Sequence, residues 1–423
     1  MPWKVGRDRV LQLMLRRFVQ RGALLVRFPD GREAMLGPGG EPSGGLHLKT
    51  EHAVRRMMLN PSLALGELYM EGEIEPIAGS LHDMLDVLSL NQTLSGDPGF
   101  SWILNWGRWA VRRLRQLNPA GLARRRISYH YDIDEAVYGL FLDEDRQYSC
   151  AYFPTGTETL EEAQLAKKRH IAAKLKLDRP GLEVLDIGCG WGGMALTLAR
   201  EYGARVTGIT LSREQLAIAR ARAEAAGLAD QVRFELLDYR AWDRPMDRVV
   251  SVGMVEHVGI NHYGTYFGAV ARALREDGVA LVHGIGRSTG PGATNPWINR
   301  YIFPGGYSPA VSEVVPAVEK AGLWITDMEI LRLHYALTLR EWSRRFAAHR
   351  EEIRARHDER FCRMFEFYLA GSESAFRHGG HMNWQLQLTR TVDALPLNRD
   401  YMLRAEQAPP GYAAAPAMTS LAV

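Results

Sequence analysis

The sequence has few cysteines and no long apolar run. Only three cysteines occur among 423 residues, and no two of them have the spacing of metal ligands. This argues against a disulfide framework and against a zinc site, so we expect no metal. No apolar run reaches the roughly 18 residues that a membrane-spanning helix needs, and the N-terminus lacks a signal-peptide core. These absences predict a cytoplasmic protein.

A large net charge is also lacking. The formal net charge is +3, which argues against a protein that coats nucleic acid. Basic residues are nevertheless concentrated before residue 130, for example at Arg124 to Arg126, and this part of the chain suits an acidic partner. The length and the hydrophobic content of 46% predict a globular protein of two domains.

Residues 1–126 predict a small α+β domain. Residues 1–22 have apolar side chains at helical spacing, and residues 23–28 and 33–36 form a hairpin pattern around Pro29-Asp-Gly. Residues 53–90 are expected to be helical, with breaks near Asn60-Pro61 and Glu75-Pro76.

The segment 100–117 places Trp102, Trp106 and Trp109 on one face of a predicted helix and its arginines on the other. Two interpretations stand side by side. The helix lies in a bilayer interface, with arginines on lipid phosphates, or it packs on the catalytic domain or a partner subunit.

Residues 127–395 alternate strand and helix patterns. Strands are expected at 184–187, 205–210, 232–236, 248–252 and 279–283, with helices at 194–202, 213–226 and 265–274. This predicts an α/β doubly wound parallel sheet, in which ligands bind beyond the carboxyl ends of the strands. A helix at 309–321, strands at 324–330 and 333–337, and helices across 338–369 follow. Residues 396–423 form a predicted tail, disordered from Ala405.

A glycine-rich turn follows the first of these strands, in the run E-V-L-D-I-G-C-G-W-G-G at 183–193. Gly188, Gly190 and Gly192 permit close approach of a ligand, and the helix that follows favours an anionic group. A dinucleotide site would also need an acid after the second strand, where the chain has Leu211 and Ser212. The turn instead resembles the first motif of class I S-adenosylmethionine (SAM) methyltransferases.

Polar residues follow the other strands at the same predicted edge. Thr210 and Gln215 can form hydrogen bonds with ribose hydroxyls. Asp238 can accept a hydrogen bond from an adenine amine, and Tyr239 can stack on the adenine ring. Glu256 and His257 follow the fourth strand, and His283 ends the fifth.

Several uncommon motifs point to the same protein family. The runs S-Y-H-Y-D (128–132), Q-Y-S-C-A-Y-F (147–153), S-V-G-M-V-E-H-V-G (251–259) and P-W-I-N-R-Y-I-F-P (296–304) accompany the glycine turn. Over residues 127–395 the chain resembles the cyclopropane-fatty-acyl-phospholipid synthases and the related mycolic acid cyclopropane synthases. The resemblance implies a class I methyltransferase (Rossmann-like) fold, SAM as methyl donor and an unsaturated phospholipid acyl chain as acceptor. It also implies a homodimer at the inner face of the cell membrane, docked through residues 1–126.

The resemblance also assigns residues. It implies a bicarbonate ion held by the positions Cys150, Glu256, His283, Ile285 and Tyr335. The cofactor positions, including Asp238 from the strand-end argument, are Tyr148, Ser149, Asp186, Gly188, Gly190, Gly192, Thr210, Gln215, Asp238, Tyr239 and Arg240. Alkene methylation needs no thiolate, so Cys150 is not expected to be a nucleophile.

The leading hypothesis is cyclopropanation of cis double bonds in phospholipid acyl chains. One alternative shares the methyl transfer but ends in a methyl-branched or methyl-unsaturated chain. A second is a catalytically silent SAM- or lipid-binding protein. The run 133–138 and Arg146 depart from the family pattern near the acyl entrance, so acyl length, double-bond position and headgroup preference are left open.

Overall fold

The computed structural model describes residues 4–95, 107–109, 116 and 135–407. Residues 4–95 contain a four-stranded sheet in the order β2-β1-β3-β4. The predicted hairpin is confirmed, because β1 and β2 pair antiparallel. The elements of this N-terminal unit are α1 (Lys4–Phe18), β1 (Leu24–Arg27), β2 (Glu33–Leu36), β3 (Gly44–Leu48), α2 (Glu51–Leu59), α3 (Pro61–Met70), β4 (Ile74–Ile77) and α4 (Leu81–Ser95).

The helix break predicted near Glu75-Pro76 is confirmed, since α3 ends at Met70 and α4 begins at Leu81, but the strand β4 that residues 74–77 form there was not predicted. Pro76 lies in this strand, and β4 is at an edge of the sheet. An edge strand tolerates proline because one side of it needs no backbone N–H donor. The break predicted at Asn60-Pro61 is confirmed, since α2 ends at Leu59 and Pro61 begins α3.

The remaining described residues form a seven-stranded sheet in the order β10-β11-β9-β8-β5-β6-β7. The five strands from β9 to β7 are parallel, while β11 is antiparallel to both β9 and β10. These strands are β5 (Glu183–Ile187), β6 (Arg205–Thr210), β7 (Val232–Leu236), β8 (Met246–Val252), β9 (Leu274–Arg287), β10 (Trp324–Ile330) and β11 (His381–Thr389). The predicted α/β doubly wound sheet is confirmed.

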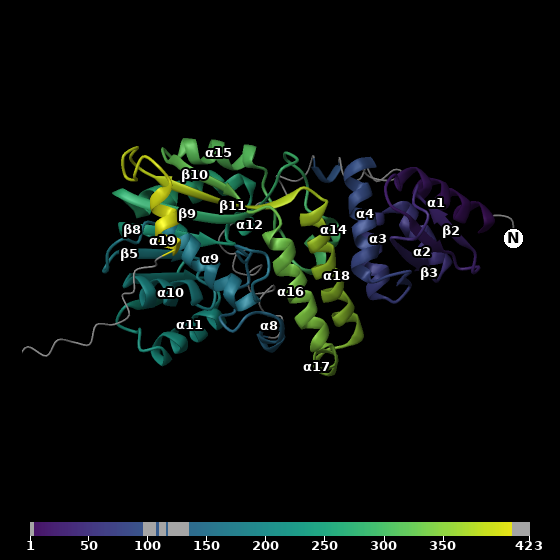
Figure 1. Ribbon diagram of the computed structural model, residues 1–423, viewed down its shortest axis with the longest axis horizontal. Coiled ribbons are helices and arrows are strands. Elements are labelled where there is room, and N and C mark those ends of the chain that lie inside the picture. Colours follow the sequence, from purple (N-terminus) through teal and green to yellow (C-terminus); the bar gives the residue numbers. More distant parts are fainter. Residues whose placement is uncertain (1–3, 96–106, 110–115, 117–134, 408–423) are drawn as a thin grey trace, which may run out of the picture.

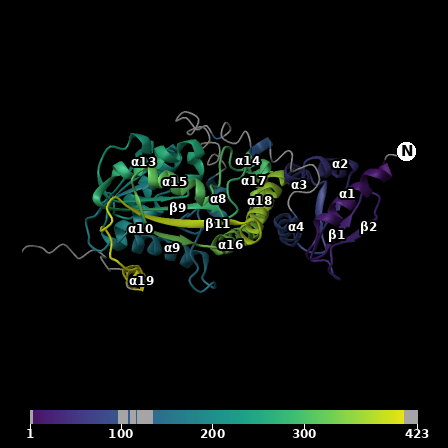
Figure 2. The same ribbon diagram turned by 90° about the horizontal axis from the view of Figure 1, so that it is seen from above.

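Helices cover both faces of this sheet, with α9, α10 and α11 on one face and α13 and α15 on the other (Figures 1 and 2). Apolar side chains of the strands pack against both layers. The helices are α8 (Glu135–Phe141), α9 (Leu160–Lys174), α10 (Gly193–Tyr202), α11 (Arg213–Ala225), α12 (Val255–Val258), α13 (Tyr263–Ala273), α14 (Pro296–Tyr301), α15 (Val311–Lys320), α16 (His334–Ala348), α17 (Arg350–Arg356), α18 (Glu359–Arg377) and α19 (Asp400–Gln407), with short 3₁₀ turns at Tyr239–Ala241 and Ile260–His262.

Two predictions at the C-terminal end are wrong. The strand expected at 333–337 is the first turn of α16, where Tyr335, Ala336 and Leu339 are buried at helical spacing. The tail expected to be disordered from Ala405 is instead helical over residues 405–407, because α19 packs beside α9 with Met402 buried and Glu406 bonded to His170. The rest of this predicted tail, 408–423, lies outside the described residues.

The N-terminal unit packs on the rest of the described chain through α3 and α4, which contact α14 and α18 (Figure 1). Glu67 of α3 accepts from Tyr301 (2.8 Å) and pairs with Arg300 (3.0 Å). Glu373 of α18 is buried, forms ion pairs with Arg340 and Arg377 of its own unit, and contacts His82 Nδ1 of α4 at 3.1 Å across the boundary. Ionic contacts therefore fix one unit against the other.

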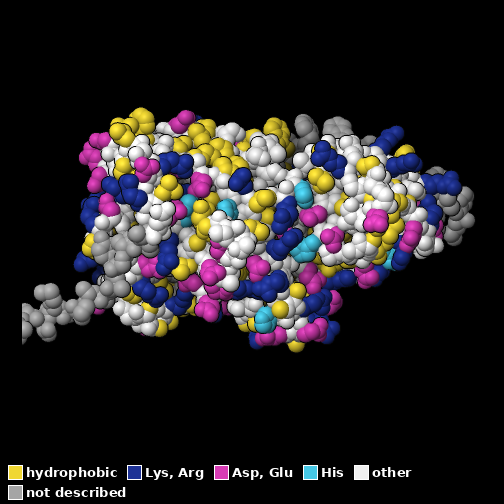
Figure 3. Space-filling model, viewed as in Figure 1, with side chains coloured by type: hydrophobic (Ala, Val, Ile, Leu, Met, Phe, Trp, Pro, Cys, Tyr) yellow, Lys and Arg dark blue, Asp and Glu magenta, His cyan; other side chains and the backbone are white. Residues whose placement is uncertain are grey.

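Basic and acidic side chains are mixed over the face shown in Figure 3, as the small net charge requires. Among the residues with described positions, no helix combines the length and the apolar character needed to cross a membrane. Trp102, Trp106, the arginine clusters at 112–115 and 124–126 and the motif 128–132 lie outside the described residues.

Candidate active site

The smaller of two adjoining cavities lies at the carboxyl ends of the parallel strands and has a volume of about 120 Å³. Most of the predicted cofactor residues line it. They are Tyr148, Ser149, Asp186, Gly188, Gly190, Thr210, Gln215 and Tyr239. The sheet therefore brings together side chains that are up to 91 positions apart in the sequence.

The glycine turn forms one wall of this cavity. Gly188 has φ 81° and Gly190 has φ 54°, and α10 begins at Gly193 directly after the turn. A Cβ added at Gly190 would meet no atom within 4 Å. The turn thus exposes bare backbone to the cavity at the N-terminus of a helix, an arrangement suited to an anionic group.

Asp186 and Lys167 are buried charged groups next to the turn. Burial raises the pKa of the Asp186 carboxyl to about 7, and its Oδ2 has no hydrogen-bond partner among the described residues. Lys167 Nζ donates to Gln147 Oε1 (2.6 Å) and Ser149 Oγ (2.9 Å). Burial lowers the pKa of Lys167 to about 8. Lys167 therefore fixes the 147–149 segment against the cavity.

Three predicted cofactor residues do not line the cavity. A Cβ on Gly192 would lie 2.6 Å from Phe234 Cζ, so this glycine acts through packing. Asp238 accepts from the Arg240 backbone N–H (3.0 Å) and from its side-chain Nε (2.8 Å), so these two residues are paired with each other. Their contacts with a cofactor stay predictions.

The larger cavity has a volume of about 870 Å³ and lies between the catalytic sheet, α18 and the N-terminal unit. All five predicted catalytic residues line it: Cys150, Glu256, His283, Ile285 and Tyr335. Tyr148, Ser149, Gly253 and His257 line both cavities. The two spaces therefore meet at these four residues.

Glu256 lies in the short helix α12 after β8. Its Oε1 accepts from the Ile285 backbone N–H, and its Oε2 is buried without a partner in the described part of the chain. Burial raises the pKa of this carboxyl to about 7. Ile285 thus contributes its backbone, not its side chain, to the placement of Glu256.

His283 is held by two amides of β11. Lys174 Nζ donates to Gln385 Oε1 (2.7 Å), so the Gln385 amide must face His283 Nδ1 (3.1 Å) with its nitrogen. Nδ1 therefore accepts, and the proton of the neutral imidazole is on Nε2. Nε2 lies 3.2 Å from Asn383, and both residues line the cavity. Burial lowers the pKa of His283 to about 3, and Lys167 and Lys174 act in the same direction.

Cys150 and His257 are held in their neutral forms. Burial raises the pKa of the Cys150 thiol, which agrees with the expectation that it is not a nucleophile. Burial lowers the pKa of His257 to about 4. Each is thus a poor source of charge near pH 7.

Aromatic rings surround the junction of the two cavities. Tyr148 stacks on Trp342 at 5.1 Å between ring centroids, and its hydroxyl is 2.8 Å from that of Tyr368. Tyr335, on α16, contacts Trp342 edge to face and Phe376 at 4.7 Å. Such rings exclude water and can face a developing cation.

Sequence reasoning missed Asn383 and Gln385 because it missed β11 altogether. The run H-M-N-W-Q-L-Q at 381–387 alternates polar and apolar residues, a pattern that predicts a strand. Lys167, a polar residue on the buried face of α9, carried no motif that could have identified it.

Comparisons with known proteins agree with this geometry. The family model described as mycolic acid cyclopropane synthetase matches residues 121–386, and a model of a domain of unknown function matches residues 10–95. The chain is 39% identical to a "Probable fatty acid methyltransferase" of Pseudomonas putida (84% of this chain, 89% of that protein). It is 37% identical to a cyclopropane-fatty-acyl-phospholipid synthase of Escherichia coli K12 (84% and 90%).

A solved structure is also similar. The mycolic acid cyclopropane synthase CmaA1, in a complex with SAH and CTAB, matches with a TM-score of 0.59 and 32% identity, over 64% of this chain and 99% of that one. The predicted class I methyltransferase fold is therefore confirmed.

Proposed function

The chain belongs to the mycolic acid cyclopropane synthetase family and is a SAM-dependent methyltransferase of the cyclopropane synthase type; from this premise we propose that it forms cyclopropane rings at cis double bonds of phospholipid acyl chains. The observation that carries the proposal is the meeting of two unlike cavities. The small one is walled by the glycine turn and the large one by apolar and aromatic side chains, and they join at Tyr148, Ser149, Gly253 and His257.

The residues of the small cavity fit SAM. Gly188 and Gly190 present bare backbone, and Thr210 and Gln215 present hydroxyl and amide groups to the same space. The buried Asp186 Oδ2 lacks a protein partner in the described chain, so it can accept from a bound ligand. When bound there, SAM supplies an electrophilic methyl group.

The large cavity supplies the conditions that methylation of an alkene needs. An isolated double bond is a weak nucleophile, so it must be positioned at short range with water excluded. Transfer of a methyl group leaves a cation on the acyl chain, which water would capture. Tyr148 and Tyr335 line the cavity, and such rings stabilise a desolvated cation by about 2 kcal/mol.

Ring closure removes a proton from the added methyl group. Bicarbonate, which the family resemblance implies, would supply a small base. The lining residues fit such an anion. With its proton on Nε2, His283 donates to the amide oxygen of Asn383, which leaves the Asn383 N–H groups for a ligand, and Glu256 Oε2 has no partner among the described residues. Glu256, with a pKa near 7, can share a proton with an anion beside it.

A methyl-branched or methyl-unsaturated product is the second candidate function. It shares every step up to the cation and differs only in the proton that is lost or in a later reduction. The similarity to a protein named as a fatty acid methyltransferase favours keeping it.

The proposal includes docking on a membrane. Trp109, 43% exposed, lines the large cavity together with Leu11 and Met14 of α1, so one border of the cavity is formed by the N-terminal unit. Val10 and Leu13 of α1 are exposed. Assembly as a homodimer at the inner face of the cell membrane is part of the same proposal and rests on family resemblance.

Methyl transfer to vesicles tests the proposal. Purified protein with SAM labelled in its methyl group should label dioleoyl phosphatidylglycerol and leave dipalmitoyl phosphatidylglycerol, which has no double bond, unlabelled. Label in both lipids, or in neither, contradicts the proposal.

A further inference from the structure

Strands β9 and β11 carry polar side chains into the large cavity at two separate levels. His283, Ile285 and Arg287 of β9 and His381 and Asn383 of β11 all line this cavity, as alternate residues on one face of a strand do. His381 pairs with Arg287, four positions from the level of His283. At a rise of about 3.3 Å per residue, the two levels are about 13 Å apart.

Arg287 has hydrogen-bond donors that the other described residues do not use. Its Nε donates to the Ser308 carbonyl at 3.0 Å, and its guanidinium lies 5.5 Å from the centre of the Tyr307 ring. Among the described residues, no carboxylate lies within ion-pair distance of Arg287, and its two terminal nitrogens have no hydrogen-bond partner. Burial of the guanidinium lowers its pKa. Glu313 acts on this guanidinium from beyond ion-pair distance and in the opposite direction. The cavity therefore contains a cation that has no direct ion pair with the described chain.

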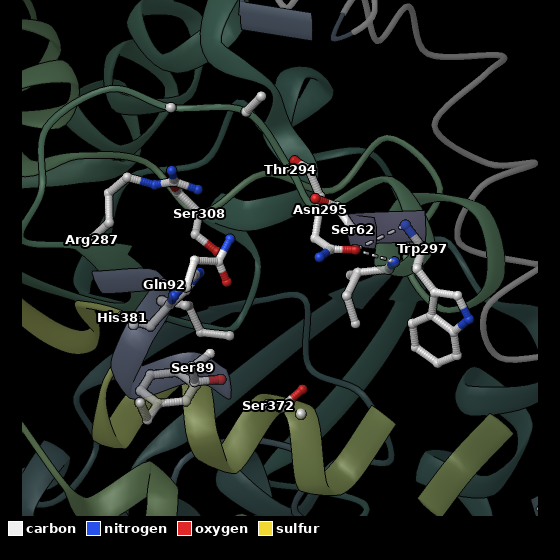
Figure 4. Close-up of a pocket in the computed structure, with 18 of the residues that line it drawn as sticks. Ser62, Ser89, Gln92, Arg287, Thr294, Asn295, Trp297, Ser308, Ser372 and His381 are labelled. Atoms are coloured by element: carbon white, nitrogen blue, oxygen red, sulfur yellow. Dashed lines mark hydrogen bonds between the residues drawn. The ribbon is translucent and has the colours of Figure 1, made fainter. Parts of the chain in front are cut away.

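The fold makes room for this guanidinium. A Cβ on Gly292 would lie 1.9 Å from Arg287 Nη1, so only glycine leaves the side chain where it is. Figure 4 shows Arg287, Ser308, Gln92 and His381 gathered on one side of the cavity, with Asn295 and Trp297 on the other.

His381 adds a second donor at this level. Its Nδ1 is buried and has no hydrogen-bond partner among the residues that the structure describes. Burial lowers the pKa of His381 to about 4, and a hydrogen bond with the Gly379 backbone acts in the opposite direction. The ring is neutral near pH 7, so it has one N–H, which serves a ligand without adding charge when it is on Nδ1.

We propose that Arg287 and His381 bind the phosphodiester group of the phospholipid substrate. An unpaired guanidinium presents a planar fork of donors that matches phosphate oxygens, and the adjoining cavity wall is apolar enough for an acyl chain. This inference rests on the proposed function and names the headgroup contact that the function leaves open.

The spacing of the two levels sets which part of the acyl chain reacts. Each C–C bond of about 1.5 Å advances an extended chain by about 1.3 Å, so about 13 Å corresponds to roughly ten bonds. About five of these bonds belong to the glycerol and the ester link. With the phosphate at Arg287 and the double bond near His283, the reacting bond therefore lies at about the sixth carbon of the acyl chain. The two ends of the chain are both excluded.

Binding of a saturated lipid tests the inference apart from catalysis. Calorimetry would compare dihexanoyl phosphatidylglycerol with dihexanoylglycerol, which lacks the phosphate, in the full-length wild-type protein and in Arg287→Gln. We expect Arg287→Gln to weaken phosphatidylglycerol binding by tenfold or more relative to dihexanoylglycerol, as loss of a charged hydrogen bond does. Arg200→Gln, at an exposed arginine of α10, is the matched control and should match the wild type.

Other results would overturn the inference. If Arg287→Gln weakened the binding of both lipids equally, the role of Arg287 would be structural. If the variant kept the wild-type preference for phosphatidylglycerol over dihexanoylglycerol, Arg287 would have no role in binding the phosphate. Dependence of hexanoate binding, but not of phosphatidylglycerol binding, on Arg287 would identify a carboxylate site. SAH binding and the thermal transition, measured for Arg287→Gln and Arg287→Lys, confirm that each variant is folded. Because these lipids have no double bond, their binding does not depend on turnover, so failure of the proposed reaction would leave this result interpretable.

Discussion

Glu256 and His283 are both shifted towards their neutral forms by burial. The pKa of Glu256 is raised to about 7 and that of His283 is lowered to about 3. Neither residue then brings a full charge into the cavity near pH 7. A small anion can therefore approach Glu256 without strong repulsion, and the neutral His283 can still donate from Nε2 to the Asn383 amide oxygen.

Removal of the Glu256 carboxyl tests its role. We expect Glu256→Gln to lower kcat by about a hundredfold or more, the size of a general acid–base contribution, while SAH affinity in calorimetry is unchanged. Unchanged product formation would show that the active site is assigned wrongly.

The same variant makes a prediction about stability. Because the pKa of Glu256 rises from its ordinary value of 4.5 to about 7 on folding, the folded protein binds more protons between these values. Its contribution is full below pH 4.5 and is lost as the pH rises to about 7, a change on the order of 3 kcal/mol. Urea titrations should therefore show a weaker fall in the free energy of unfolding for Glu256→Gln than for the wild type over this range. Parallel pH profiles would contradict the cause given for the shift.

Gln385 determines the tautomer of His283. Gln385→Glu replaces the amide that donates to Nδ1 with a carboxylate beside Lys174, so the proton should move to Nδ1 and Nε2 should become an acceptor. We expect kcat to fall at least tenfold, with SAH affinity retained, because the Asn383 amide nitrogen must then donate to Nε2 and is lost to the anion. Nitrogen NMR of the histidine ring measures the tautomer directly. A proton that stays on Nε2 in this variant would refute the argument.

The site residues found from the sequence are those within motifs. Glu256 follows, and His283 ends, a strand that its apolar run identifies in the sequence. Because both strands were predicted to be parallel, the two residues were expected at the same edge of the sheet. Asn383, Gln385 and Lys167 contribute only through partners far away in the chain. Their roles depend on tertiary contacts, which no local pattern carries.

At the scale of elements, the glycine turn joins cofactor binding to packing. Gly190 has open space in place of a Cβ, whereas a Cβ on Gly192 would overlap Phe234 at 2.6 Å. Both residues have positive φ, which costs about 1 kcal/mol or more in alanine. The two positions therefore serve different purposes within one turn.

This difference predicts unequal effects of two matched substitutions. Gly190→Ala should weaken SAH binding at least tenfold with a loss of stability of about 1 kcal/mol, because its methyl group enters the cavity. Gly192→Ala should lose a further 1–3 kcal/mol through overpacking. Urea titration and calorimetry measure the two effects, and equal losses of stability would contradict the assignment.

Helices and strands could be predicted where the apolar residues followed a single spacing, either that of a helix or that of a strand. The strands β5 to β8 were found because short apolar runs end in turn residues. The start of α16 was misread because Leu333, Tyr335 and Leu337 alternate like a strand, while the burial of Ala336 and Leu339 follows a helix. Tertiary packing decided between these two patterns.

At the scale of the molecule, the N-terminal unit completes the large cavity. α1 and α4 supply part of its lining, and the contacts of Glu67 with Tyr301 and of His82 with Glu373 hold this unit against α14 and α18. The sequence predicted a separate small α+β region but not its place over the active site, because that place depends on scattered ion pairs.

From the surface of the same unit we predict that the protein binds membranes and that salt weakens this binding. α1 exposes Leu13 together with Arg9, Arg16 and Arg17, so vesicles with anionic lipids should bind the protein, and 0.5 M salt should weaken this binding. Leu13→Asp should weaken it further, whereas Leu403→Asp, at an exposed leucine of α19 at the other end of the molecule, should not. Cosedimentation measures the bound fraction. If neither salt nor Leu13→Asp changed the bound fraction, a purely structural role for α1 would be favoured.

The chemical identity of the product tests the central claim most directly. Lipids of a host that lacks its own enzyme and expresses this chain would be analysed by mass spectrometry before and after mild hydrogenation over a catalyst that reduces double bonds but leaves cyclopropane rings intact. A ring and a methylated alkene gain the same mass, but only the alkene then takes up hydrogen. We predict that the acyl chains gain one methylene and resist hydrogenation. Acyl chains that gain this mass and are reduced under these conditions would contradict cyclopropane formation.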